Sequence, residues 1–321
     1  MQTKKPLRLF LMSALIAVSL FSSSPRTAFA LHWLAQDAPA DAEISEEIRN
    51  ATVNLYCRIK AGKKTYATTG SGVFIDDDGV ILTNAHVAQY FLLDGAEGKV
   101  SGHCSVRTGS PAKERYTASI LYFPSIWAEQ NKDELKKGGS RGNGVNDFAL
   151  LYVTGAKKGS LPASFPALPI DLSGTTSEGE IVTVAGYPTG DLDFDGIRKK
   201  LMLMASSPMI TRTGALTEAL QLDMLTLGSS AVGSFGVSGG PVVDNGEVAG
   251  IVALKNAAKK SHVLRAITVS YVDRMLTALT GRSLETILAD DLAKQAEENR
   301  KNMPADTLKI VTSGILGTNK K

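Results

Sequence analysis

A short glycine-rich stretch around Ser238 has the composition of a nucleophile loop. Its sequence is Gly236-Val237-Ser238-Gly239-Gly240-Pro241. A serine hydroxyl attacks a carbonyl only when a base removes its proton and donors receive the negative charge that forms. Small residues on both sides of the serine allow a tight loop to direct backbone N–H groups at one point. We expect the N–H groups of Gly236 and Ser238 to form such an oxyanion hole, whereas the alternative is a hairpin with an incidental serine.

Two upstream residues have the side chains that an active serine requires. His86 follows the apolar run 79–82, where a strand ends and a polar loop begins. Asp147 stands at the start of the apolar run 148–153. A carboxylate there can accept the N–H of a histidine, fix its tautomer and stabilise the imidazolium form. Each residue alone has a structural alternative, because lone histidines and strand-start aspartates are common. The order of all three is therefore more informative than any one of them.

The segments that must position these residues have the pattern of strands. Apolar runs with period two occur at 53–59, 72–75, 80–83, 100–106, 116–122 and 148–153. A second series occurs at 181–187, 201–205, 220–227, 241–243, 248–254 and 263–268, and a helical period follows at 272–279. Two sets of about six short strands predict an all-β protein built from two antiparallel barrels or sandwiches. The predicted units are residues 51–157 and 179–281, joined by a Pro/Ser/Gly-rich linker at 158–178.

With these segments in this order, the chain resembles the trypsin-like serine peptidases, specifically the bacterial exported branch that includes the HtrA proteases. The motifs that match are Gly70-Ser71-Gly72-Val73-Phe74-Ile75, Leu82-Thr83-Asn84-Ala85-His86-Val87, Asp147-Phe148-Ala149-Leu150-Leu151, Val184-Ala185-Gly186-Tyr187-Pro188 and the Ser238 loop. The resemblance covers residues 51–280. It implies a chymotrypsin-like fold of two six-stranded β-barrels with the active site in the cleft between them. It also implies protein or peptide substrates, with His86 as general base and then acid, Asp147 as its orienting partner and Ser238 as the acylated nucleophile.

The sequence departs from the family at two places. Trypsin has an aspartate just before its nucleophile, which pairs with a newly cut N-terminus. Val237 stands there in this chain, so activation by insertion of an N-terminus is not expected. HtrA enzymes usually carry a PDZ domain of some 80–100 residues after the catalytic domain. Only about 40 residues follow Gly281, so no PDZ domain is expected.

The substrate pocket is weakly encoded. By alignment to the family, Val232 falls at the base of the primary pocket, and Ala253, Leu254 and Lys255 fall on its wall. An apolar base would not pair with a basic side chain, so we expect cleavage after small or apolar residues. The alternative is that the ammonium of Lys255 attracts an acidic side chain.

Residues 1–30 have the pattern of a signal peptide. A basic start precedes the apolar stretch Leu9–Phe21, and Ala28-Phe29-Ala30 supplies the small residues that a signal peptidase recognises. The apolar stretch is short for a bilayer span. We therefore expect cleavage after Ala30, no stable membrane anchor, and a periplasmic or secreted protein. Residues 31–50 are a polar leader, either disordered or forming one helical turn.

The net positive charge of the chain lies mostly in that signal segment. The net charge of all 321 residues is +3. Residues 1–30 contain four basic residues and no acidic one, which leaves 31 basic against 32 acidic residues in the rest. This balance gives no reason to expect nucleic acid or an anionic membrane as a partner.

Cys57 and Cys104 are the only cysteines. In an oxidising compartment a disulfide between them is expected, and the alternative is two buried thiols too far apart to meet. His103 beside Cys104 is only a faint indication of a metal site, because no other ligand is spaced to join them. We expect neither a metal ion nor a cofactor.

Two stretches break the β pattern. Residues 124–146 contain Trp127, a charged run and a glycine-rich end, which predicts an inserted loop with room for one helix. Residues 282–321 are a helical tail. Within it, 283–302 predict one charged amphipathic helix that packs on the second barrel, with self-association as the alternative.

Three other interpretations compete with this resemblance. The Ser238 loop also fits the nucleophile elbow of α/β-hydrolases, but there the acid and histidine follow the serine, and only His262 does so here. Residues 191–196 resemble the start of a calcium loop, but Met202 stands where a bidentate glutamate belongs. A solvated hairpin turn is favoured there.

The remaining alternative is a protease-like fold that has lost activity and serves as a binding module.

Overall fold

The computed structural model describes residues 44–95, 100–137, 144–218, 221–255 and 263–318, which all belong to one compact unit. The predicted signal peptide and most of the leader fall on residues 1–43, outside the described residues. The end of the leader forms helix α1 (Glu46–Ala51). Among the described residues, no helix is both long enough and apolar enough to span a bilayer.

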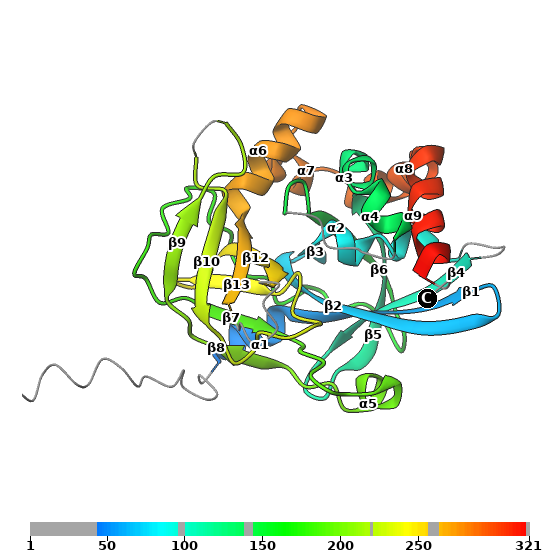
Figure 1. Ribbon diagram of the computed structural model, residues 1–321, viewed down its shortest axis with the longest axis horizontal. Coiled ribbons are helices and arrows are strands. Elements are labelled where there is room, and N and C mark those ends of the chain that lie inside the picture. Colours follow the sequence, from blue (N-terminus) through cyan, green and yellow to red (C-terminus); the bar gives the residue numbers. More distant parts are fainter. Residues whose placement is uncertain (1–43, 96–99, 138–143, 219–220, 256–262, 319–321) are drawn as a thin grey trace, which may run out of the picture. The chain divides into compact units, whose positions relative to one another are not determined.

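Six antiparallel strands close into a barrel in the first part of the described chain (Figure 1). They are β1 (Thr52–Ala61), β2 (Lys64–Asp76), β3 (Val80–Thr83), β4 (Val100–Thr108), β5 (Lys113–Tyr122) and β6 (Ala149–Ala156). Their order around the barrel is β1-β2-β3-β6-β5-β4. Each predicted run overlaps one of these strands, because apolar side chains at alternate positions, such as Val53, Leu55 and Ile59, fill the interior.

Seven antiparallel strands form a second sheet. They are β7 (Thr183–Gly186), β8 (Met204–Ser206), β9 (Ile210–Gly214), β10 (Met224–Ser229), β11 (Pro241–Asp244), β12 (Glu247–Lys255) and β13 (Val263–Thr268). Their order is β8-β7-β11-β12-β13-β10-β9, without closure. The prediction of a mostly β, chymotrypsin-like fold with C-terminal helices is confirmed, but the second unit has seven strands rather than six. The extra strand is β9, whose exposed Thr211 and Arg212 give no apolar alternation.

The segment 158–178 forms backbone hydrogen bonds with both units. The N–H of Leu168 donates to the carbonyl of Phe74 in β2 at 3.0 Å. Almost next to it, the carbonyl of Pro169 accepts the N–H of Val248 in β12 at 2.8 Å. The linker is therefore fixed to one strand of each unit.

Arg107 of β4 also joins the two units, although it is almost fully buried (2 % exposed). Its guanidinium donates to the carbonyls of Ala112 at 2.7 Å, Ile197 at 3.1 Å and Arg198 at 2.8 Å. The last two carbonyls belong to helix α5 (Phe194–Lys199). Burial lowers the pKa of this guanidinium, and the carbonyl oxygens replace the water that burial removes.

The aspartate-rich segment 191–196 is the start of α5. The carboxylate of Asp193 accepts the N–H of Gly196 at 2.7 Å, which is the hydrogen bond of a helix N-cap. The predicted hairpin turn at this segment is therefore wrong, because the aspartate starts a helix instead.

The C-terminal helices differ from the predicted single helix at 283–302. Helix α6 (Val269–Thr280) agrees with the predicted period and ends at Gly281, whose φ is 75°. The tail then forms α7 (Leu284–Leu288) and α8 (Leu292–Asn302). The helical conformation is interrupted between them because the carboxylate of Asp291 caps the N-terminus of α8. Helix α8 packs on β5 and β6 of the first barrel, not on the second unit as expected.

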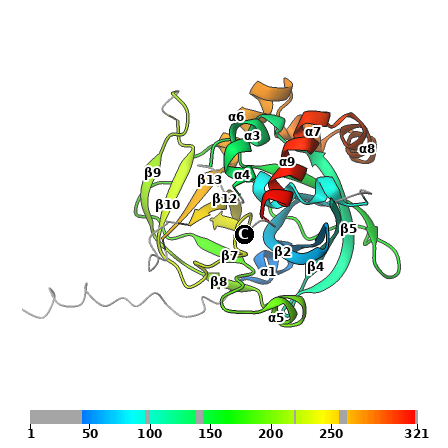
Figure 2. The same cartoon turned by 45° about the vertical axis from the view of Figure 1, so that its right-hand side comes forward.

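Helix α9 (Ala305–Thr318) lies in the predicted helical tail and packs on the described part of the insertion at 124–146 (Figure 2). The described part of that insertion has two helices, α3 (Ser125–Gln130) and α4 (Lys132–Lys136). A Cβ atom on Gly314 would lie 2.9 Å from Cβ of Leu135 in α4. The glycine therefore allows α9 to pack closely against α4. Residues 138–143 of the insertion lie outside the described residues.

Cys57 and Cys104 form a disulfide inside the first barrel. They are directly opposite each other in the pairing of β1 with β4. Their Sγ atoms are 2.02 Å apart, and both residues are buried. A cross-link over a sequence separation of 47 residues stabilises by ~4 kcal/mol in the chain-entropy model. Cys104 is thus not available as a metal ligand.

Candidate active site

His86 lies directly after the end of β3, as the sequence predicts. Asn84 has an extended backbone, and residues Ala85–Ala88 form the single helical turn α2. This turn directs the imidazole inward, where it is only 7 % exposed. The side chain of Gln89 donates to the carbonyl of His86 at 2.7 Å, which satisfies one of the free carbonyls of this short helix.

The carboxylate of Asp147 contacts His86 through both of its oxygens. Oδ2 lies 2.8 Å from Nδ1 of the imidazole, and Oδ1 accepts the backbone N–H of the same histidine at 2.9 Å. Asp147 is fully buried. Since an ionised carboxylate only accepts hydrogen bonds, the neutral imidazole must carry its proton on Nδ1. Nε2 then has a free lone pair and can act as a proton acceptor.

Hydrogen bonds to Asp147 and to the residue before it fix the position of this aspartate. The amide of Asn84 donates to its backbone carbonyl at 2.9 Å. The preceding residue, Asn146, has a φ of 56°, a left-handed conformation that asparagine tolerates better than most residues. Its N–H donates to the hydroxyl of Tyr271 at 3.0 Å, and its side-chain amide donates to Gln130 at 3.1 Å. Helices from the second unit and from the insertion thus support the carboxylate.

Ser71 of β2 holds the Ser238 loop against the first barrel. Its N–H donates to the carbonyl of Ser238 at 2.7 Å. Its hydroxyl donates to the carbonyl of Gly236 at 2.7 Å and accepts the N–H of Tyr187 at 2.9 Å. The carbonyl of Ser71 accepts the hydroxyl of Thr83 at 2.7 Å. Thr83 lies three residues before His86, so these bonds connect the serine loop to the element that carries the histidine.

The glycines of the loop have positive φ angles and close neighbours. The φ of Gly236 is 94° and that of Gly239 is 82°. A Cβ atom on Gly239 would overlap the carbonyl oxygen of Ser71 and the hydroxyl of Thr83. Only glycine therefore fits this position without displacing the chain.

Ser238 itself is partly exposed, unlike its neighbours Val237 and Gly239. The N–H of Gly239 donates to the carbonyl of Val252 at 2.7 Å. Within the described residues, by contrast, the N–H groups of Gly236 and Ser238 donate to no protein acceptor. They are the two groups that the sequence predicts for an oxyanion hole.

Two of the four residues predicted to form the substrate pocket, Val232 and Ala253, have described side chains, and both are buried. Val232 is fully buried with apolar neighbours in the core of the second sheet, so its side chain does not line an open pocket in this structure. Ala253 is also buried. The side chains of Leu254 and Lys255 lie outside the described residues. The pocket wall therefore stays a prediction.

The sequence interpretation gave no role to Ser71, which makes four hydrogen bonds around the serine loop. A sequence signal for this role exists, because the hydroxyl of Ser71 stands between two glycines and directly before the apolar run 72–75. A polar side chain at a buried strand position needs partners. Those partners, on β3 and on the loop, could not be named without the fold.

Known proteins resemble this chain over most of the site. A model of the trypsin-like peptidase domain family matches residues 70–251, more than half of the chain. Serine protease HTRA1A of Danio rerio is 28 % identical over 224 residues, which cover 68 % of this chain and 37 % of that protein. Serine protease HTRA1B of the same fish is 26 % identical over 290 residues, 85 % of this chain and 50 % of that protein.

The chain thus spans at most about half the length of these relatives. The family match, however, contains the buried His86–Asp147 pair and the complete loop around Ser238. The chain belongs to the family of trypsin-like peptidase domains.

Proposed function

We propose that this protein is an exported serine endopeptidase that uses Ser238, His86 and Asp147. The observation that carries the proposal is the double contact of His86 with the buried carboxylate of Asp147. It fixes the imidazole in the tautomer that accepts a proton at Nε2. Both Danio rerio relatives are named serine proteases, which supports the same activity here.

The proposed reaction proceeds through an acyl-enzyme. Oγ of Ser238 attacks the carbonyl carbon of a peptide bond while Nε2 of His86 takes the hydroxyl proton. The free N–H groups of Gly236 and Ser238 stabilise the oxyanion, and loss of one such donor typically costs about 10²–10³ in kcat. The imidazolium, stabilised by Asp147, then protonates the leaving amine. Water hydrolyses the acyl-enzyme, with His86 again acting as base. No metal or cofactor enters these steps.

Export to the periplasm or the cell exterior is part of the proposal. The support is the signal-peptide pattern of residues 1–30 together with the disulfide between Cys57 and Cys104. Disulfides persist in oxidising compartments and are rare in the cytosol.

A fluorophosphonate probe tests the proposal directly, because it reacts covalently with an activated serine. We expect the wild type to be labelled and Ser238→Ala to remain unlabelled. Ser234→Ala is the matched control, since it removes a hydroxyl two residues before the same loop. The Ser234 hydroxyl donates to the carbonyl of Phe235 and accepts the N–H of Gly190. Labelling that persists in Ser238→Ala would remove this residue from the role. A wild type that is neither labelled nor able to cleave casein would favour the binding module.

Gly239→Ala should slow labelling by about 10²-fold or more, because its Cβ displaces the serine loop from Ser71 and Thr83. Gly246→Ala is the control. Gly246 also has a positive φ, 86°, but a Cβ atom there meets nothing within 4 Å. Both variants incur backbone strain of about 1–2 kcal/mol, so a difference in labelling rate isolates the steric effect. Equal labelling rates in the two variants would contradict the tight fit of the loop.

A further inference from the structure

The outer face of the first barrel has a hollow lined by cationic side chains. In the pairing of β1 with β4, Arg58 lies opposite His103 and Lys60 lies opposite Ser101. On the other side of β1, Lys60 pairs with Thr65 of β2. Because side chains alternate along a strand, these residues all point outward, whereas Ile59 between the two cations points into the core.

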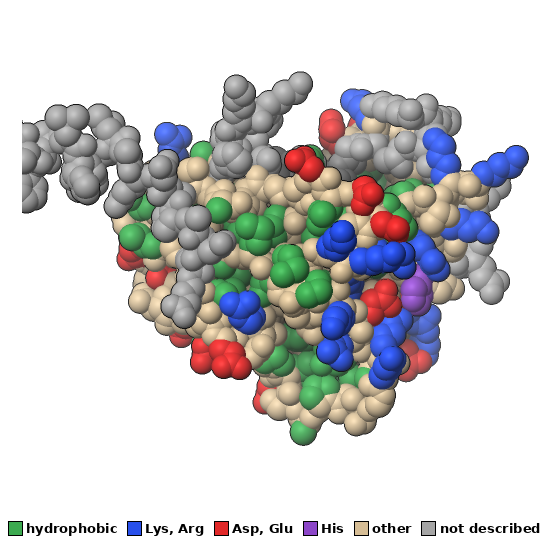
Figure 3. All heavy atoms as spheres, turned by 90° about the horizontal axis from the view of Figure 1, so that it is seen from below, with side chains coloured by type: hydrophobic (Ala, Val, Ile, Leu, Met, Phe, Trp, Pro, Cys, Tyr) green, Lys and Arg blue, Asp and Glu red, His purple; other side chains and the backbone are tan. Residues whose placement is uncertain are grey.

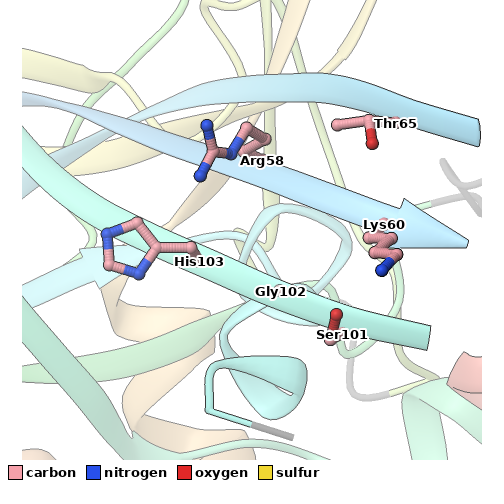
Figure 4. Close-up of a pocket in the computed structure, with 6 residues that line it drawn as sticks. All are labelled: Arg58, Lys60, Thr65, Ser101, Gly102 and His103. Atoms are coloured by element: carbon pink, nitrogen blue, oxygen red, sulfur yellow. The ribbon is translucent and has the colours of Figure 1, made fainter. Parts of the chain in front are cut away.

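These side chains surround a cavity of about 290 Å³ (Figure 4). The residues that line it are Arg58, Lys60, Thr65, Ser101, Gly102 and His103. Arg58 and Lys60 project from β1, Thr65 projects from β2, and Ser101 and His103 project from β4 (Figure 4). One water needs only about 10–15 Å³ of such volume, so the hollow has more space than a single small anion needs.

Among the described side chains around this hollow, positive charge exceeds negative charge. Nζ of Lys157 lies 3.4 Å from Nε2 of His103, which adds a third cation to Arg58 and Lys60. The acid that contacts this group is Asp94, whose Oδ1 is 3.9 Å from Nδ1 of His103 and also accepts the N–H of Cys104. Within the described part of the chain, neither Arg58 nor Lys60 forms an ion pair. Figure 3 shows Lys and Arg side chains gathered around a histidine on this face.

This concentration of charge is local. Beyond residue 30 the chain has 31 basic and 32 acidic residues, so an average surface would carry no net charge. Cations placed close together without counter-ions repel one another, and an anion between them relieves that repulsion. The hollow thus has the electrostatic character of an anion site.

We propose that this hollow binds phosphate, with room for more than one linked phosphate group. A guanidinium offers paired donors that match phosphate oxygens, and an ammonium adds charge without a fixed geometry. The hydroxyls of Thr65 and Ser101 supply further donors on both sides of Lys60. Condensed phosphates in solution and the phosphate headgroups of an anionic lipid offer the same chemistry.

The site is separate from the proposed active site and does not depend on the protease activity. Arg58 lies four residues along β1 from Asn54, which is paired with Ser71 beneath the serine loop. At a rise of about 3.3 Å per residue, this corresponds to roughly 13 Å along the strand. Occupation of the hollow should therefore leave fluorophosphonate labelling of Ser238 intact.

Calorimetric titration of the folded protein with inorganic tripolyphosphate tests the proposal. We expect Arg58→Ala/Lys60→Ala to bind about tenfold more weakly or worse, since each cation contributes charge-assisted hydrogen bonds. The matched control is Arg212→Ala/Arg265→Ala, which removes the same charge from two exposed arginines of the second sheet. This control should bind within about twofold of the wild type, because distant exposed charges are screened.

A second arm distinguishes the source of the phosphate. Co-sedimentation with phosphatidylglycerol vesicles, compared with vesicles of neutral lipid, tests a headgroup, and the tripolyphosphate titration tests a soluble anion. Loss of either kind of binding in Arg58→Ala/Lys60→Ala alone supports the site. An equal loss in the control variant, or equally tight binding of a polyglutamate peptide, would show general charge attraction and overturn it. Absence of binding to both probes would overturn it as well.

Discussion

Ser238→Ala and His86→Ala should each lower kcat on a peptide substrate by on the order of 10⁵- to 10⁶-fold, and the double variant should be no slower than either single one. The hydroxyl is a weak nucleophile unless Nε2 of His86 takes its proton, so removing one partner removes the function of both. The residual rate should come from substrate binding and from the N–H groups of Gly236 and Ser238. Steady-state cleavage of a peptide substrate, with all three variants at matched concentration, measures this.

The control is again Ser234→Ala, which should keep kcat within a few-fold of the wild type. Thermal unfolding of Ser238→Ala should be close to that of the wild type, because Ser238 is partly exposed and makes no side-chain hydrogen bond within the described residues. His86→Ala should unfold at a lower temperature, because it removes a hydrogen bond from the buried carboxylate of Asp147, so its kcat is compared per folded molecule. If the effects of Ser238→Ala and His86→Ala multiply in the double variant, the two residues act independently. That result would contradict the proposed mechanism.

The frame of the site could be predicted from the sequence because it depends on local patterns. Apolar runs with period two predicted the strands of the first barrel. His86 was identified just after one such run and Asp147 just before another. The turn between β2 and β3 was also predictable, because Asp76-Asp77-Asp78-Gly79 is a composition typical of tight turns, and Gly79 adopts a φ of 96° there. The missed strand, β9, has mostly polar outward residues, and its pairing with β10 determines its conformation more than its own composition does.

The contacts that position the site could not be predicted, because they connect distant segments. The hydroxyl of Tyr271, 125 residues away, accepts the N–H of Asn146. The partners of Ser71 are likewise on other elements. An amphipathic pattern shows that a helix has an apolar face but not what covers it. For that reason α8 was assigned to the second unit, although it packs on β5 and β6.

The cluster of cations around the hollow could not be predicted from the sequence either. Arg58 and His103 are 45 positions apart in sequence, and only the pairing of β1 with β4 places them opposite each other. A sum over the whole chain is close to zero and therefore hides the cluster. The expectation of no anionic partner rested on the total charge of the chain, whereas anion binding depends on how that charge is distributed over the surface.

Asp147→Asn should lower kcat/KM by about 10⁴-fold with little change in the fold. The asparagine can keep the hydrogen bond from the backbone N–H of His86 through its own Oδ1. Its NH₂ group, however, donates a hydrogen bond to Nδ1, where the carboxylate accepted one from Nδ1–H. The imidazole then carries its proton on Nε2 and cannot accept one from Ser238. Peptide cleavage measures the loss, and near-wild-type unfolding shows that the fold is kept.

Asp223→Asn is the matched control, because Asp223 is the other fully buried aspartate among the described residues. Its carboxylate accepts the N–H groups of Leu216 and Thr217 and pairs with Arg274, far along the chain from His86. Its replacement should lower the unfolding temperature, since it breaks a partly buried ion pair, while kcat/KM per folded molecule stays close to the wild type. If kcat/KM fell by about 10⁴-fold in both variants, the loss would follow from removing any buried carboxylate, through its effect on stability, and not from the tautomer of His86. A loss confined to Asp147→Asn assigns the effect to the tautomer of His86, which is the step on which the proposed chemistry depends.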